Sequence, residues 1–121
     1  MNLLNGIGIP VHETSTRIKG RSASGEHYEF DILAHNGDAI VVIEVKTTLR
    51  PQDVKDFIVK LDCMKSWAPG YAGNVIHGAM AFLKADGGSD VMAQKRGLLV
   101  IRATGNSATI VNEPDFTPKA W

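Results

Sequence analysis

The sequence predicts an α/β protein in which helices flank a central mixed β-sheet. Several short segments are rich in β-branched and aromatic residues and end at Gly-containing turns, and two other segments have helical signals. The expected order is three strands, a helix, a strand, a second helix and two final strands, which is typical of helices packed on a mixed sheet. A chain of 121 residues suits one domain covering residues 1–121.

The first three strands come from the N-terminal part of the chain. Residues 11–19 are rich in β-branched and polar types and predict an exposed strand. Residues 27–35 and 39–47 are the clearest strands, because apolar and polar residues alternate in them. Asn36-Gly37 lies between them and predicts a tight hairpin, since both central residues of a type I′ turn need positive φ.

The rest of the chain alternates helices with strands. Pro51 suits the first turn of a helix, and an apolar stripe at helical spacing follows it. Residues 89–96 predict a short helix with Ser89 as its N-cap and Gly97 at its C-terminal end. The three strands expected here are residues 75–84, 98–103 and 107–111.

The composition limits the possible classes of function. Lys plus Arg and Asp plus Glu both number 13, so the formal net charge is zero, and any attraction to phosphate must come from a local patch or a bound cation. Cys63 is the only cysteine, which excludes an internal disulfide and fits a reducing compartment. No stretch approaches the roughly 20 apolar residues that cross a bilayer, and no signal peptide is evident. We therefore expect a cytoplasmic protein with no membrane partner.

The predicted hairpin carries the candidate chemistry. With Asn36 and Gly37 in the turn, cross-strand partners have numbers that sum to 73, and partners share one side of the sheet. One side is apolar and is expected to face the core; it consists of Tyr28, Phe30, Ile32, Val41, Ile43 and Val45. The other side, called the site face below, contains Glu29, Asp31, Leu33, Val42, Glu44 and Lys46.

Two carboxylates on the site face are placed to share a metal ion. Asp31 and Glu44 are expected as diagonal neighbours, with backbone positions about 7–8 Å apart. A divalent ion held by such oxygens neutralises a phosphodiester, activates bound water and stabilises the leaving oxygen. Lys46 follows on the same face and could orient the water or stabilise the pentavalent phosphate. The pattern predicts a site for phosphodiester hydrolysis, although an ordinary solvated hairpin surface has the same composition.

The pattern of Asp31 followed by Glu44-Val45-Lys46 resembles the PD-(D/E)xK, or restriction-endonuclease-like, nuclease superfamily. The resemblance continues through GAMAFLKA and LLVIRATGNSATIV and covers most of the chain, although Phe30 replaces the proline of the motif. It implies a restriction-endonuclease-like α/β sandwich and a metal-dependent nuclease that acts on DNA. It also implies that Asp31 and Glu44 bind Mg²⁺ or Mn²⁺, that the carbonyl of Val45 completes the coordination, and that Lys46 is the catalytic lysine.

The N-terminus departs from this family pattern. The family core begins with a helix that often supplies a further acidic residue, and here only MNLLNGIG precedes the first strand. Its loss leaves apolar surface open and favours a dimer, and it also suits a non-catalytic binding or assembly module with the same fold. Glu13 or Glu29 could replace the missing carboxylate, and the register favours Glu29 because it lies opposite Glu44.

Four other residues are candidates for contacts with nucleic acid. Arg17, Lys19 and Arg21 form a small basic run that could bind the phosphate backbone, although edge strands also use basic residues against aggregation. Gln52 begins the helix after the Glu-x-Lys strand and could contact substrate, although a solvated helix surface would also carry a glutamine.

Overall fold

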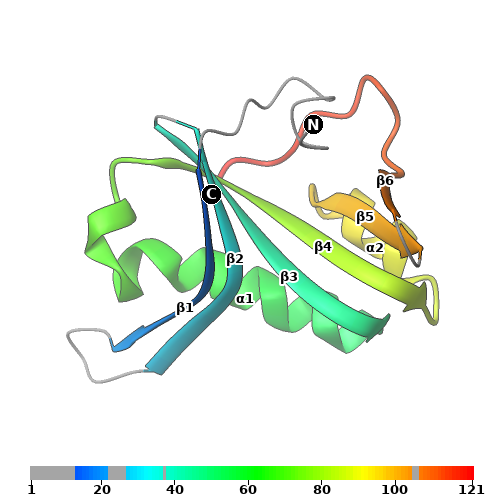
Figure 1. The fold of residues 1–121 in the computed structure, drawn as a ribbon, viewed down its shortest axis with the longest axis horizontal. Helices are drawn as coiled ribbons and strands as arrows, with labels where there is room; N and C mark the ends of the chain where they lie inside the picture. The colour runs from blue at the N-terminus through cyan, green and yellow to red at the C-terminus, as the bar shows by residue number, and fades with distance from the viewer. Residues whose placement is uncertain (1–12, 22–26, 37, 105–106) are drawn as a thin grey trace.

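The computed structural model describes residues 13–21, 27–36, 38–104 and 107–121. These residues form a six-stranded sheet whose strands follow the chain in order, from β1 at one edge to β6 at the other (Figure 1). The expected N-terminal segment before β1 lies outside the described residues. The elements are β1 (Glu13–Arg21), β2 (His27–Asn36), β3 (Ala39–Leu49), α1 (Pro51–Trp67), η2 (Pro69–Tyr71), β4 (Val75–Ala85), α2 (Ser89–Lys95), β5 (Leu99–Thr104) and β6 (Ser107–Ile110).

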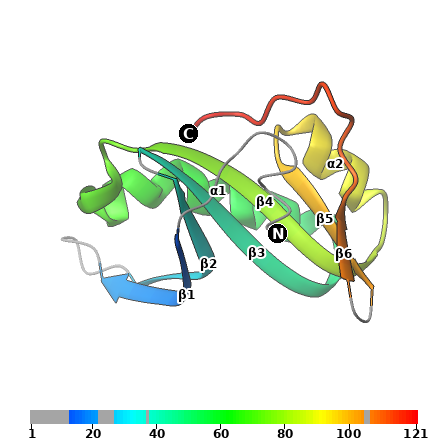
Figure 2. The same cartoon turned by 45° about the horizontal axis from the view of Figure 1, so that its top comes forward.

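The sheet is mixed, as the sequence predicts. β1, β2 and β3 are antiparallel neighbours, β4 and β5 run parallel to β3, and β6 is antiparallel to β5. The helices α1 and α2 make the two parallel crossovers and lie on the same face of the sheet (Figure 2). No helix among the described residues is long and apolar enough to span a membrane.

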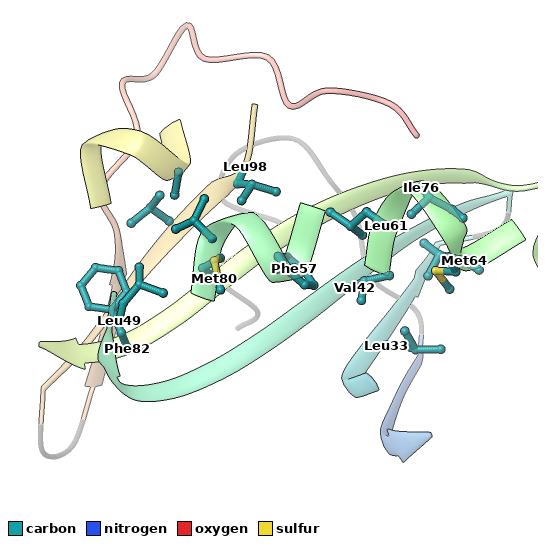
Figure 3. Close-up of a cluster of buried hydrophobic side chains, with 14 residues drawn as sticks. Leu33, Val42, Leu49, Phe57, Leu61, Met64, Ile76, Met80, Phe82 and Leu98 are labelled. Carbon is teal, nitrogen blue, oxygen red and sulfur yellow. The ribbon is translucent and has the colours of Figure 1, made fainter. Parts of the chain in front are cut away.

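The main core lies between α1 and the sheet (Figure 3). The predicted helical stripe is confirmed, because Val54, Phe57, Leu61 and Met64 are buried. Both helices contribute to this core, since Ala93 of α2 belongs to the same cluster. Their partners include Leu98, which precedes β5, and on the strands Leu33, Ile40, Val42, Ile76, Met80 and Val100.

The sequence predicts that the apolar side of the hairpin, which includes Val41, Ile43 and Val45, faces the core. In the structure this is not the side that packs under α1. Leu33 and Val42 belong to the main core, so α1 covers the site face. The other side forms a smaller cluster around Ala34 and Val41, and Val45 at its end is 49% exposed. The physical reason is that the site face changes character along its strands. It is apolar near the turn, where α1 covers it, and charged farther on, so alternation within the hairpin alone could not identify the core.

The β2–β3 register is also displaced by two residues from the predicted one. Asn36 pairs with Ala39 and Ile32 with Ile43, so partner numbers sum to 75 rather than 73, and Asn36 ends β2 instead of occupying the turn. Because side chains alternate with a period of two, this shift leaves each residue on its predicted side. Continued by one residue, the observed register sets position 31 level with Glu44 rather than Val42.

The last residues of the chain run back past the sheet (Figure 2), and Trp121 at the end packs against the main core. The backbone N–H of Lys119 donates to the carbonyl of Gly97 at 3.0 Å, and that of Trp121 donates to Ile76 at 2.7 Å. The indole Nε1 of Trp121 donates to Asp62 of α1 at 2.8 Å. This segment therefore connects α1 to the start of β4.

Ser89 has a different role from the predicted N-cap. The cap position is Gly88, which has φ of +70°, and Ser89 is the first residue of α2. The buried Ser89 hydroxyl donates to the carbonyl of Leu49 at 2.8 Å, so it connects α2 to the end of β3.

We expect Ser89→Ala to lower the free energy of unfolding by about 1 kcal/mol, the net contribution of a typical intramolecular hydrogen bond. The loss stays modest because the Leu49 carbonyl also accepts the N–H of Asp86 at 2.8 Å. Urea unfolding followed by circular dichroism measures the change. Ser66→Ala, at an exposed position of α1, is the control and should change stability by less than about 0.5 kcal/mol. Equal effects of the two variants would contradict the structural role of Ser89.

Candidate active site

The candidate site lies where β2 and β3 stop pairing. Their ladder ends at Ile32 and Ile43, whereas β2 continues to pair with β1 as far as His27. Beyond that point β1 and β2 diverge from β3 and β4 (Figures 1 and 2). Asp31 is the first residue of β2 past the last pair, and Glu44 follows Ile43 on β3. The two predicted carboxylates therefore stand on opposite strands at the point of divergence.

Asp31 supplies a side-chain link between the two strands where the backbone ladder ends. Its Oδ2 accepts a hydrogen bond from the backbone N–H of Val45 at 2.9 Å. A residue in an antiparallel strand directs its N–H and its C=O toward the same neighbouring strand. The carbonyl of Val45 therefore also faces the Asp31 side. The second oxygen of Asp31, Oδ1, accepts no hydrogen bond from the described residues.

Glu44 is buried at 8% exposure beside the main core. Its position on β3 is level with Met80 of β4, which is fully buried. Burying a carboxylate is costly unless a cation or hydrogen bonds compensate it. Here the Nζ of Lys60, on α1, lies 3.0 Å from Oε1 of Glu44 and supplies that charge.

Lys46 follows two residues later on the same face and is more accessible. Its side chain is 40% exposed, and its Nζ lies 3.8 Å from Oδ1 of Asp53 in the first turn of α1. The other oxygen of Asp53 accepts the backbone N–H of Arg50 at 2.9 Å and so helps to cap the helix. The long ion pair leaves the Lys46 ammonium able to contact a phosphate.

For the other candidate carboxylates, Glu13 and Glu29, the structure describes the strand positions. Glu29 pairs with Lys19 of β1, beyond the end of the β2–β3 ladder, so the prediction that it lies opposite Glu44 is wrong. The reason is the two-residue register shift together with the divergence of the strands. Glu13 pairs with His35, near the turn end of β2. The side chains of Glu13 and Glu29 lie outside the described part of the chain.

The basic run of β1 is close in register to the site. Arg17 lies between two residues of β1 that pair with Ile32 and Phe30, so its backbone is level with Asp31. Arg21 pairs with His27 at the far end of the strand. The side chains of this run also lie outside the described part. Gln52 is exposed on α1 and donates to Oδ1 of Asp56 at 2.8 Å, and no described contact connects it to Glu44.

Two residues of α1 belong to the site and were missed by the sequence reasoning, namely Asp53 and Lys60. Both fall at helical spacing with the buried stripe, since Asp53 precedes Phe57 by four residues and Lys60 precedes Met64 by four. A charged residue at such a position indicates an oppositely charged partner on the covered sheet. This signal was present in the sequence.

The donor set suits a small, hard divalent cation. Among the side chains that the structure describes, no three His, Cys, Asp or Glu residues group closely enough to hold a metal by themselves. Mg²⁺ commonly binds through one or two carboxylates and completes its shell with waters and substrate phosphates. Asp31, whose Oδ1 accepts no hydrogen bond from the part of the chain that the structure describes, and Glu44, with the nearby carbonyl of Val45, fit that mode. Mn²⁺ prefers similar oxygen ligands.

Solved structures with the same architecture include two endonucleases. A repair endonuclease from Pyrococcus abyssi aligns with a TM-score of 0.57 and 19% identity over 82% of this chain and 41% of its own. EndoMS in complex with double-stranded DNA aligns with a TM-score of 0.50 and 15% identity over 76% of this chain and 37% of its own. The chain has a restriction-endonuclease-like fold. This finding confirms the fold class that the sequence predicts.

The restriction-endonuclease-like fold also occurs in a crystallised protein of unknown function, which aligns with a TM-score of 0.55 and 14% identity over 81% of this chain and 51% of its own. The chain thus spans about half, or less, of the solved structures that it matches. No protein-family model and no curated protein sequence matches it.

Proposed function

We propose that this restriction-endonuclease-like chain is a Mg²⁺- or Mn²⁺-dependent nuclease that hydrolyses phosphodiester bonds in DNA, with residues 1–121 as one catalytic domain. The observation that carries the proposal is the divergence of β2 and β3, where Asp31 and the buried Glu44 stand at adjoining strand positions and Lys46 follows on the same face. The fold shared with two endonucleases supports it.

Each residue of the site has a distinct role in this proposal. Asp31 and Glu44 hold the cation, and the carbonyl of Val45 is directed toward the same space. The cation, when bound, neutralises the phosphodiester and acidifies a water molecule. Lys46 contacts a phosphate oxygen or orients the attacking water, because its side chain is 40% exposed and its position on β3 lies two residues from Glu44 on the same face. Glu29, two residues before Asp31, is the better candidate for a third carboxylate, since Glu13 lies farther along the sheet.

The proposed substrate is nucleic acid, and DNA is favoured because one of the structures with this fold is bound to double-stranded DNA. The net charge of zero requires a local source of attraction. The basic run of β1, Arg17, Lys19 and Arg21, supplies it in this proposal, because its strand borders β2 beside the site. Gln52, in the first turn of α1, is a further candidate contact. A lone cysteine, Cys63, fits the cytoplasm as the place of action.

The proposal is tested by incubating the purified protein with supercoiled plasmid and with single-stranded DNA, in Mn²⁺, in Mg²⁺ and in EDTA. We expect cleavage only when a divalent cation is present, because the site holds two carboxylates and needs a cation to bind an anionic phosphodiester. Cleavage that continues in EDTA, or that is unchanged in Asp31→Ala, would reject the proposed site. No cleavage of either DNA would reject the proposed function.

A non-catalytic binding or assembly module is the alternative function, and exposed apolar residues favour it. Val45 and Leu83 are 49% and 53% exposed, and both line a shallow pocket of about 160 Å³. Such a surface suits a homodimer contact. Two measurements distinguish the two functions. Sedimentation of the wild type and of Leu83→Ser reports the dimer, and calorimetry reports Mn²⁺ binding. A stable dimer that Leu83→Ser dissociates, without Glu44-dependent Mn²⁺ binding, would favour the module.

A further inference from the structure

The ion pair between Lys60 and Glu44 has a consequence for how the site takes up a cation. The Nζ of Lys60 lies 3.0 Å from Oε1 of Glu44. Glu44 and Ser89 are the two polar or charged residues that are buried in the described part of the chain. Lys60 itself is partly exposed, at 30% of its side chain. One end of the pair is thus fixed in the protein, and the other end reaches solvent.

The surroundings of Glu44 make this lysine necessary when no metal is bound. Lys60 lies on α1 between Phe57 and Leu61, which are 1% and 2% exposed, and Glu44 is level with the buried Met80. Next to apolar side chains of this kind an unpaired carboxylate is strongly disfavoured. The ammonium therefore compensates the buried carboxylate and holds it in place.

The same ammonium conflicts with a divalent cation. A Mg²⁺ ion lies about 2.0–2.1 Å from a ligating oxygen. Such an ion on Oε1 would be within roughly 5 Å of an ammonium held at 3.0 Å from that oxygen, and the two positive charges would repel strongly in a partly buried site. The four-carbon stem of lysine is flexible, so Lys60 can withdraw toward solvent.

We propose that Lys60 is a positioning residue whose ammonium pairs with Oε1 of Glu44 in the metal-free protein and is displaced from that oxygen when the divalent cation binds. This inference rests on the proposed metal site. Lys60 stabilises the buried carboxylate in the metal-free protein and also lowers the affinity of the site for the cation. Removing Lys60 therefore has opposite effects on stability and on metal affinity. The metal-free protein loses stability, and the affinity for the cation increases.

The test is Mn²⁺ titration calorimetry on the full chain, together with thermal unfolding in EDTA and in saturating Mn²⁺. Lys60→Met should bind Mn²⁺ about tenfold more tightly than the wild type, the change expected for a partly buried ion pair. It should melt at a lower temperature in EDTA, and saturating Mn²⁺ should reduce that deficit. Lys60→Gln, which keeps a hydrogen-bond donor without the charge, should change both properties in the same direction by less.

Two further variants serve as controls. Lys55→Met removes a positive charge from an exposed position of the same helix, and its Mn²⁺ affinity should stay within about twofold of the wild type, as expected for a solvent-screened charge. Lys60→Arg retains the charge and should restore the stability in EDTA without tightening Mn²⁺ binding. In a Glu44→Gln background, Lys60→Met should have a smaller effect in EDTA than in the wild type, because the charge–charge interaction is already lost.

The possible failures are distinguishable. Mn²⁺ binding that disappears in Glu44→Gln but is unchanged or weaker in Lys60→Met would overturn the displacement and leave the proposed nuclease intact. Absence of Glu44-dependent Mn²⁺ binding in the wild type would overturn the metal site and the displacement together. DNA cleavage assayed in parallel then decides separately whether the proposed function survives.

Discussion

Glu44→Gln is expected to reduce metal-dependent DNA cleavage by at least about 10²–10³-fold, a loss typical of removing one transition-state stabiliser. Glutamine has the shape of glutamate, and its carbonyl can still accept the hydrogen bond from Lys60. It lacks the negative charge that a divalent cation requires. Asp31→Asn should behave similarly, because its amide oxygen can still accept the N–H of Val45. Both variants therefore remove charge with little change of shape.

A series of variants separates metal binding from the later chemistry. Cleavage is measured with plasmid over a range of Mn²⁺ concentrations, and Mn²⁺ affinity is measured by calorimetry. Glu44→Gln should lose the Mn²⁺ affinity, whereas Lys46→Met should keep Mn²⁺ binding and lose turnover, since Lys46 contacts the phosphate in the proposed mechanism. Asp115→Asn, at an exposed position far along the chain, is the matched carboxylate control and should cleave normally. Wild-type cleavage by Glu44→Gln would remove this site from the mechanism.

The side of the hairpin on which Asp31, Glu44 and Lys46 lie could be predicted, because it depends on whether a residue's position along its strand is odd or even and not on the exact turn. The sequence predicts the hairpin turn one residue too early, and this error shifts the predicted pairing by two residues. Asp31, Glu44 and Lys46 still fell on one face, since side chains repeat every second residue. A shift of one would have put Asp31 on the opposite side from Glu44.

The covered face of the sheet and the role of Lys60 could not be read from the hairpin alone. α1 packs over the site face. Which face the helix covers is set by the crossover connection from β3 to β4, and the pairing of these two strands joins segments that are far apart in the sequence. The opposite side of the hairpin is more uniformly apolar, so the alternation of residues predicts the core on that side. Once α1 is known to lie over Glu44, a lysine beside the buried stripe of α1 becomes an expected partner.

Gly78→Val is expected to lower the free energy of unfolding by about 3 kcal/mol or more, and Gly78→Ala by about 1–3 kcal/mol, because both overpack the core. Gly78 lies on β4 beneath α1. A Cβ atom there would lie 2.5 Å from Cδ1 of Leu61, 2.7 Å from Cδ2 of Leu98 and 3.2 Å from Cε2 of Phe57. All three side chains are nearly fully buried, so none has free space into which it can move. The helix must then move away from the sheet.

This displacement should also disturb the candidate site, because Lys60 lies between Phe57 and Leu61 on the same helix. Urea unfolding measures the stability change, and Mn²⁺ calorimetry measures the effect on the site. Gly73→Ala is the matched control, since a Cβ at Gly73 would have nothing within 4 Å and its cost should stay below about 0.5 kcal/mol. A Gly78→Val protein as stable as the wild type would mean that α1 does not pack this closely on β4. The placement of Lys60 over Glu44, which depends on that close packing, would then have no support.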